Sequence, residues 1–267
     1  MGIINVTPDS FSDGGDNFNP DKALETALEL EANGADIIDV GGESTRPGAQ
    51  GLSVEEELGR VLPVIRRLSS VVRVPISIDT YKAEVARQAI DTGATVVNDV
   101  SGLSRDSDLA AVVARAGIPI ILMHSRGPSN DMYRNADYDD VMTQVIHELT
   151  DTINKALSAG ISREQIIVDP GLGFAKKSHQ TFQLLAGFNQ LTTLDRPILI
   201  GSSRKSFLKE VLGECVPLDR EWGTAATVAY SVFKGAHIVR VHGLREMSQV
   251  VQVAERLRQE AESNEDS

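Results

Sequence analysis

Many of the side chains in this sequence that could do chemistry come directly after short apolar runs. One group combines carboxylates, an amide and an amine, namely Asp79, Asn98, Asp169 and Lys205. Carboxylates and amides accept and donate hydrogen bonds in a plane, which suits the amino and amide edges of a heteroaromatic ring. The alternative is a structural ion-pair network in which Lys205 only neutralises Asp169.

A second group is rich in cations and consists of Asn5, Arg46, Arg240 and His242. Guanidinium and imidazole groups suit a phosphate or a diphosphate. The alternative for Arg46 is that it points from a glycine-rich stretch into water. The run "SSRKS" at residues 202–206 opens an expected helix, where free backbone N–H groups favour an anion, although such residues also cap helices.

The apolar runs before these side chains have the character of buried strands. They are continuous rather than alternating, as expected of strands covered on both faces in a parallel sheet. Eight of them alternate with segments of helical spacing, and they are expected to end at Asn5, 41–43, Asp79, 98–99, 123–124, Asp169, 202–205 and 240–242.

This alternation predicts an α/β protein, a TIM (β/α)8 barrel, with a doubly wound open sheet as the second possibility. In a parallel barrel all the strand ends share one rim, where barrel active sites are built. One polar strand end usually only satisfies the following loop, but eight together favour a binding site. With no linker in sight, residues 1–267 are expected to form a single domain, with a disordered acidic tail at 259–267.

The composition of the chain narrows the range of functions that it could have. The net charge of −12 argues against sequence-independent binding to nucleic acid or to an anionic membrane. The single cysteine, Cys215, cannot form an internal disulfide, and we find neither a membrane-length apolar run nor a signal peptide. We therefore expect a cytoplasmic protein. Neither a phosphate-binding Walker loop nor histidines at metal-ligand spacing are found.

Seven motifs in order resemble the dihydropteroate synthase family of pterin-binding enzymes. They are "NVTPDSFSDGG", "GGESTRPG", "SIDT", "NDVSG", "DPGLGF", "SSRKS" and "RVHG". The first two together are highly specific, whereas "NDV" alone would mean little. The resemblance extends from residue 1 to about residue 243.

The resemblance implies a TIM barrel that is usually a homodimer and that uses Mg²⁺. It implies that (7,8-dihydropterin-6-yl)methyl diphosphate is joined to 4-aminobenzoate, giving 7,8-dihydropteroate and diphosphate. This step of tetrahydrofolate biosynthesis is the one that sulfonamides block.

The resemblance also assigns residues by motif. The metal contact would be Asn5, which would touch Mg²⁺ held by the diphosphate. The pterin contacts would be Asp79, Asn98, Asp169 and Lys205, with Val100 and Met123 flanking the ring and Arg240 over a face. The diphosphate contacts would be Arg46, Arg240 and His242. The aminobenzoate site would be bordered by Thr45, Arg46, Pro47, Phe174, Lys205 and Ser206. The catalytic set would be Asp13, Arg46, Asp169 and Lys205.

A mechanism follows as a hypothesis. Cations stabilise the departing diphosphate, and Asp169, with Asp79, stabilises positive charge that spreads into the pterin. An arylamine is a neutral nucleophile at physiological pH, so a strong general base is unnecessary. Residues 7–18 and 43–51 are expected to be loops that close over the aminobenzoate side, with Asp13 organising the closed form.

Three departures from the family pattern stand out. Family members usually carry a short segment before the position of residue 1, so we expect either an earlier start or the lack of an N-terminal hairpin. Gly243 stands where an acid is commoner, which predicts weaker support for His242. The run "GLGFAKK" leaves Phe174 in place but leaves the roles of Lys176 and Lys177 open.

Two other functions are compatible with the pterin-reading residues. A methyltetrahydrofolate-binding methyltransferase domain would share them, but it should not need the "NVTPDSFSDGG" and "STRPG" loops. A catalytically silent pterin-binding paralogue could act as a partner or regulatory protein. Apolar faces at 219–236 and on the last helix could form a dimer interface or pack on the barrel.

Overall fold

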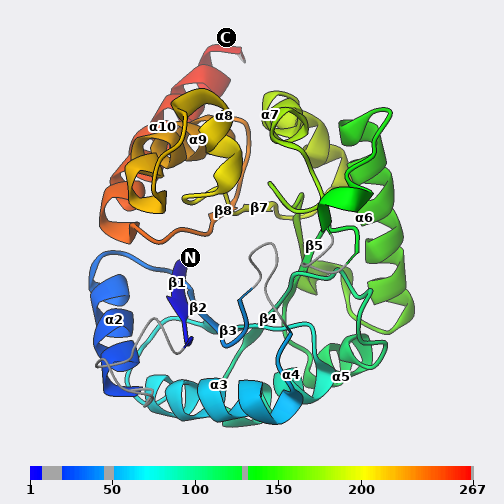
Figure 1. The fold of residues 1–267 in the computed structure, drawn as a ribbon, viewed down its shortest axis with the longest axis vertical. Coiled ribbons are helices and arrows are strands. Elements are labelled where there is room, and N and C mark those ends of the chain that lie inside the picture. The colour runs from blue at the N-terminus through cyan, green and yellow to red at the C-terminus, as the bar shows by residue number, and fades with distance from the viewer. Residues whose placement is uncertain (8–19, 45–50, 128–131, 266–267) are drawn as a thin grey trace.

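The computed structural model describes residues 1–7, 20–44, 51–127 and 132–265. Parallel strands alternate with helices that surround them, so the predicted α/β class is confirmed (Figure 1). The strands are β1 (Gly2–Asn5), β2 (Ile38–Gly41), β3 (Ile76–Asp79), β4 (Val96–Asp99), β5 (Ile120–Met123), β6 (Ile166–Asp169), β7 (Leu199–Ile200) and β8 (Ile238–Val239).

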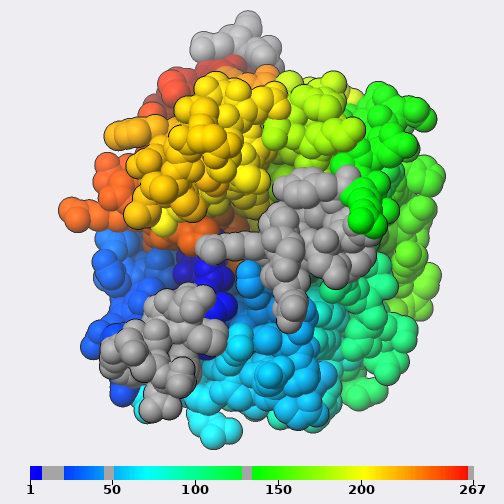
Figure 2. Space-filling model, in the orientation of Figure 1, coloured from blue at the N-terminus to red at the C-terminus, as the bar shows by residue number. Residues whose placement is uncertain are grey.

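The strands close into a barrel. The strands β1 to β6 form one parallel ladder and β7 pairs with β8. Two further parallel bridges join these sheets, Val168 with Ile198 and Gly2 with Val241. The N–H of Val241 donates to the carbonyl of Met1 at 3.0 Å. Figure 2 shows the dark-blue first strand beside the orange segment near residue 240. Every strand therefore has a neighbour on both sides, which confirms the TIM barrel over the open sheet.

The last two strands differ from the expectation in length. The strand β7 ends at Ile200 and β8 ends at Val239. The polar residues 202–205, Arg240 and His242 therefore follow these strands instead of ending them, and Val241 between the last two forms the bridge to Gly2. The strands β7 and β8 pair with each other through only two residues each. Single bridges beside them, Val168 with Ile198 and Gly2 with Val241, complete the barrel.

Helices cover the outside of the barrel. They begin and end where local sequence predicts: Ser53 and Glu56 form a capping box at the start of α3, and Gly93, at φ +128°, follows the end of α4. The α-helices are α2 (Pro20–Ala32), α3 (Val54–Leu68), α4 (Ala83–Thr92), α5 (Leu109–Ala116), α6 (Val141–Ser158), α7 (Ser178–Ala186), α8 (Lys209–Leu212), α9 (Glu221–Phe233) and α10 (Leu244–Glu265). The 3₁₀ helices are η1 (Met132–Asn135), η2 (Arg163–Gln165), η3 (Phe188–Leu194), η4 (Ser206–Leu208) and η5 (Pro217–Arg220).

The barrel interior is apolar at one level and polar at another. A small apolar cluster separate from the main core contains Met1, Val96, Ile121 and Leu199. Partly buried Ile37, Ile167 and Ile238 pack against it. Because these residues come from strands all around the barrel, they fill its interior on the amino-terminal side of the rim residues.

The expected disordered tail is wrong for residues 259–265, because α10 continues to Glu265. Arg256 pairs with Glu260, and Arg258 lies 3.7 Å from Glu262, both at i,i+4 spacing. Such pairs support a helix on its exposed face, so the acidic composition indicated a solvated helix rather than disorder. None of the described helices is both long and apolar enough to cross a membrane.

Candidate active site

The sheet register brings the predicted residues to one rim. Asn5 lies opposite Gly41, and Gly41 lies opposite Asp79. Asp79 in turn lies opposite Asn98, and Met123 lies opposite Asp169. The prediction that these strand ends meet is therefore confirmed for β1 to β6.

Arg240 is the centre of the polar layer. Its Nε donates to Oδ2 of Asp39 at 2.6 Å and its Nη2 donates to Oδ2 of Asp79 at 2.8 Å. The amide of Asn98 also donates to Oδ2 of Asp39, at 3.1 Å. The structure thus places Arg240 among the acids, a contact that its assignment to the cation-rich group did not anticipate.

Asp39 is a site residue that the sequence reasoning missed. It is fully buried, and its Oδ1 has no hydrogen-bond partner among the described residues. It was overlooked because it lies inside the second apolar run, two residues before the strand ends. The available signal was an acid within an otherwise apolar strand, at a position that shares a face with the strand's last residue.

Burial and crowding set the ionisation of Asp79. Burial raises the pKa of Asp79 to about 7; Arg240 opposes this rise, and the neighbouring Asp39 adds to it. Two carboxylates share one guanidinium, so Asp79 is poised between its acceptor-only and donor forms near neutral pH.

Lys205 and Asp169 lie on the other side of the rim. Lys205 Nζ donates to the carbonyl of Leu172 at 2.6 Å and lies 4.4 Å from the centre of the Phe174 ring. Burial lowers the pKa of Lys205 to about 8, although the charge of Asp169 opposes this shift. Asp169 accepts from the N–H of Gly171 at 2.7 Å. Lys205 therefore holds a backbone carbonyl, and the simple Lys205–Asp169 pair proposed as the alternative is not formed.

His242 has support that the sequence did not reveal. Its Nδ1 lies 2.9 Å from Oγ of Ser203, and its N–H donates to the same hydroxyl at 3.2 Å. A side chain at Gly243 would collide with the carboxylate of Glu221, which accepts from Arg204 Nε at 2.6 Å. Ser203 therefore supports His242 through a neutral hydroxyl, in place of the acid that is commoner at position 243.

The remaining predicted site residues differ in how far they are exposed to solvent. Met123 is buried, Val100 and Phe174 are half-buried, and Ser206 is exposed at the start of η4. Asn5 is half-buried at the end of β1. Asp13, Thr45, Arg46 and Pro47 lie outside the described residues, as do most of both expected loops.

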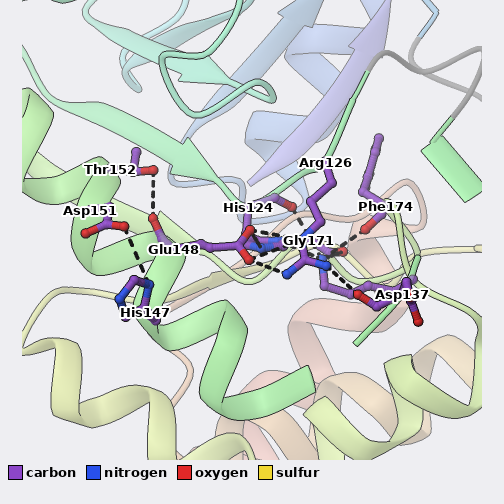
Figure 3. A network of polar contacts seen from close by, with 10 residues as sticks. His124, Arg126, Asp137, His147, Glu148, Asp151, Thr152, Gly171 and Phe174 are labelled. Atoms are coloured by element: carbon purple, nitrogen blue, oxygen red, sulfur yellow. Dashed lines mark hydrogen bonds and ion pairs between the residues drawn. The ribbon is translucent and has the colours of Figure 1, made fainter. Parts of the chain in front are cut away.

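A partly buried network next to the rim, centred on His124, was also missed. His124 follows β5, and its Nε2 lies 3.0 Å from Oε2 of Glu148 on α6. Arg126 Nε donates to the same carboxylate at 3.1 Å, and these three side chains point toward one another (Figure 3). Burial, reinforced by the charge of Lys176, lowers the pKa of His124 to about 4, so the imidazole is neutral. Its partners lie on elements distant in sequence, which a single motif does not reveal.

Among the described residues no cluster of three or more His, Cys, Asp or Glu could hold a metal. Asn5 offers one amide oxygen, and Mg²⁺ commonly binds through one or two protein oxygens together with phosphate groups. The donor set therefore fits a metal that is bound jointly with a phosphate-bearing ligand.

Comparisons with known proteins decide the family. The model of the pterin binding enzyme family matches residues 1–242. This chain is a member of the dihydropteroate synthase family of pterin-binding enzymes. The dihydropteroate synthase of Synechocystis is 46% identical over 257 residues, covering 96% of this chain and 89% of that protein.

Solved structures of dihydropteroate synthases support the same family assignment. The Clostridium difficile dihydropteroate synthase, determined in the presence of pteroic acid, superposes with a TM-score of 0.91 at 43% identity, covering 96% of this chain and 95% of that one. The Xanthomonas albilineans dihydropteroate synthase with 4-aminobenzoic acid gives a TM-score of 0.90 at 41% identity, covering 97% and 92%. Both relationships extend well beyond the motifs and include the whole barrel.

The raised pKa of Asp79 predicts a pH-dependent cost in stability. The folded state holds the proton up to about pH 7, whereas the ordinary pKa of an aspartate carboxyl is 3.8. Between these values the folded state binds more protons, so the free energy of unfolding falls as pH rises. Relative to wild type, Asp79→Asn should therefore gain up to about 4 kcal/mol between pH 4 and pH 8. Urea unfolding of both proteins across this range measures the difference, and parallel pH profiles would contradict it.

Proposed function

We propose that this chain is a dihydropteroate synthase. It condenses (7,8-dihydropterin-6-yl)methyl diphosphate with 4-aminobenzoate to give 7,8-dihydropteroate and diphosphate. The observation that carries this proposal is that the strand ends Asp79, Asn98 and Asp169 share one rim, in a chain 46% identical to a dihydropteroate synthase. The single cysteine suits the cytoplasm, where such a biosynthetic enzyme would work.

The polar layer supports pterin binding. Asn98 and Asp79 come from adjacent strands, and both are buried at the same level of the barrel. Their oxygens and amide hydrogens can pair with the amino, amide and ring-nitrogen groups of a pterin edge. The unpartnered Oδ1 of Asp39 leaves an acceptor below them, which suits a ligand or water that donates a hydrogen bond.

The reaction needs charge stabilisation at two places. The bond between the exocyclic methylene carbon and the diphosphate oxygen breaks, and the electron pair leaves with the oxygen. Positive charge then spreads into the pterin, close to the buried carboxylate of Asp169, which is 5% exposed. The amine nitrogen of 4-aminobenzoate forms the new bond to this carbon and loses one proton to solvent.

Lys205 lies where the two substrates would meet. It follows β7 on the rim, and its ammonium lies 4.4 Å from the centre of the Phe174 ring. Burial lowers the pKa of Lys205, and the charge of Asp169 opposes this shift. A cation here orients the pterin on one side and borders the arylamine on the other. His242, supported by Ser203, and Arg46 are the proposed diphosphate contacts.

The first test is diphosphate release by the purified chain with each substrate omitted in turn. Release should require both substrates and match dihydropteroate formation. Lys205→Met should lower kcat/KM at least 100-fold, because it removes the half-buried cation at the junction. The matched control is Lys209→Met, whose exposed ammonium pairs with Glu214, and it should leave kcat/KM within about twofold.

Each other outcome has a meaning. Diphosphate release without 4-aminobenzoate would indicate a hydrolase. Tight binding of the pterin diphosphate without turnover would support the silent paralogue. Equal rates for Lys205→Met and Lys209→Met would contradict the assigned site.

We further propose that Mg²⁺ accompanies the diphosphate and that the amide of Asn5 is one of its ligands. When bound, the ion would neutralise charge on the leaving diphosphate. Asn5→Ala should raise the Mg²⁺ concentration that gives half-maximal rate about tenfold and leave the KM for 4-aminobenzoate unchanged. Rate measurements at graded Mg²⁺ test this, and an unchanged Mg²⁺ requirement would remove Asn5 as a ligand.

The chain is also proposed to act as a homodimer through α9 and α10. A groove of about 470 Å³ between these helices is lined largely by apolar side chains, including Phe233, Val253 and Leu257. Val253 is 62% exposed and Leu257 is 58% exposed. Exposed apolar surface of this kind favours association.

Val253→Asp should convert the dimer into a monomer, because a carboxylate would be buried in the interface without a partner. Light scattering on a size-exclusion column measures this as a fall from twice the 28.8 kDa chain mass to that mass. Leu218→Asp is the control: Leu218 is 68% exposed on η5, outside the groove, and its change should leave the dimer intact. A wild-type chain that elutes as a monomer would overturn the proposal.

A further inference from the structure

The segment of residues 170–176, which follows β6, has an unusual backbone. Gly171, Gly173 and Ala175 have positive φ values of 66°, 76° and 48°. Ala175 adopts this conformation although its Cβ disfavours it. A side chain at Gly171 would collide with the carbonyl of His124. A segment with this backbone needs contacts that hold it in place.

The buried amine of Lys176 supplies contacts that hold this segment in place. Its side chain is 1% exposed, and its Nζ donates to the carbonyls of Phe174 at 2.9 Å and Gly171 at 3.1 Å. The same Nζ lies 2.8 Å from Nδ1 of His124 and 3.4 Å from its carbonyl. One buried amine therefore ties the 170–176 segment to the residue that follows β5.

The partner of Lys176 is itself fixed. Because the imidazole of His124 is neutral, its Nδ1 can accept from Lys176 while its Nε2–H donates to Glu148. Arg126 donates to Glu148 as well (Figure 3). Its guanidinium also lies over the Tyr138 ring, 3.9 Å from the ring centre. The chain of contacts thus runs from α6 through His124 to Lys176.

The front of the same segment contacts the proposed active site. The carbonyl of Leu172 accepts from Lys205 at 2.6 Å, and the Phe174 ring lies against the Lys205 ammonium. Lys176 holds the carbonyls on either side of Leu172 in sequence, those of Gly171 and Phe174, while Lys205 holds that of Leu172 itself. Displacement of the segment would therefore move Lys205 and Phe174 together.

We propose that Lys176 is a positioning residue for the arylamine side of the site. It acts through the 170–176 segment and fixes Phe174 and Lys205 at the place where 4-aminobenzoate would bind. This inference rests on the proposed function. Asp79 and Asn98 come from β3 and β4, so the pterin-reading side should depend much less on Lys176.

The kinetic test compares Lys176→Met with Lys177→Met. Methionine keeps the aliphatic bulk and removes the amine in both variants, and Lys177 is an exposed neighbour of the same type. Lys176→Met should raise the KM for 4-aminobenzoate at least tenfold while the KM for the pterin diphosphate changes less than threefold. Lys177→Met should behave as wild type. Equal changes in both KM values, or none, would overturn the inference.

Amide hydrogen exchange gives a readout that does not depend on activity. The N–H of Phe174 donates to the carbonyl of Gly171 at 3.0 Å, which is an internal bond of the segment. Exchange in peptides covering 170–176 should accelerate at least tenfold in Lys176→Met but not in Lys177→Met, with the strands β2 to β4 unchanged. Uniform acceleration across the barrel would mean a general loss of stability and would overturn a positioning role.

A milder variant keeps the inference testable if Lys176→Met does not fold. Glu148→Gln weakens the far end of the network, since Glu148 is 35% exposed and contacts His124 rather than the segment. It should shift the KM for 4-aminobenzoate and the exchange of 170–176 in the same direction by a smaller factor. A wild-type chain that is itself inactive would count against the proposed function, while the exchange result would still decide the role of Lys176.

Discussion

The ion-pair cluster at Arg240 is the contact on which the arrangement of the site depends. One guanidinium, just after the last strand, binds buried carboxylates on the second and third strands. It therefore joins the end of the chain's barrel to its beginning at the level of the rim. Breaking one partner of such a buried pair leaves an uncompensated charge, which is costly. The cluster lies above an apolar barrel interior, so the polar layer has little room to rearrange downward.

This constraint divides the site into two parts with different rigidity. The proposed pterin contacts Asp79 and Asn98 belong to strands, whose positions are set by the sheet register. The residues proposed for the arylamine side follow strands, and their positions depend on side-chain contacts to loop carbonyls. Such a division suits a reaction in which one substrate is enclosed deep in the barrel and the second approaches across its rim.

Much of the fold and part of the site could be predicted from sequence. Continuous apolar runs ending in polar residues identify parallel strands, and barrel geometry then requires Asn5, Asp79, Asn98 and Asp169 to share a rim. These successes depend on local spacing or on topology, both of which the sequence encodes directly.

The parts of the site that could not be predicted depend on contacts between residues that are distant in the sequence. Asp39 lies 201 positions from Arg240, and Lys176 lies 52 positions from His124, so no motif relates either pair. Asp39 in "DIIDV" and Lys176 in "GLGFAKK" are plain in the sequence. The role of a buried charge can be interpreted only when its partner is known. The support of His242 by Ser203 was missed for the same reason. The acidic composition at the end of the chain led to the expectation of disorder. In the structure, acidic residues of the last helix pair with arginines one turn away.

The most direct test of this account is a double-mutant cycle between Asp79 and Arg240, measured as the affinity for the dihydropterin diphosphate by calorimetry. If the buried cluster organises the pterin pocket, Asp79→Asn and Arg240→Met should weaken binding non-additively, with a coupling of about 1 kcal/mol or more. Additive losses would show that the two residues act on the ligand independently and would contradict the central role given to their ion pair.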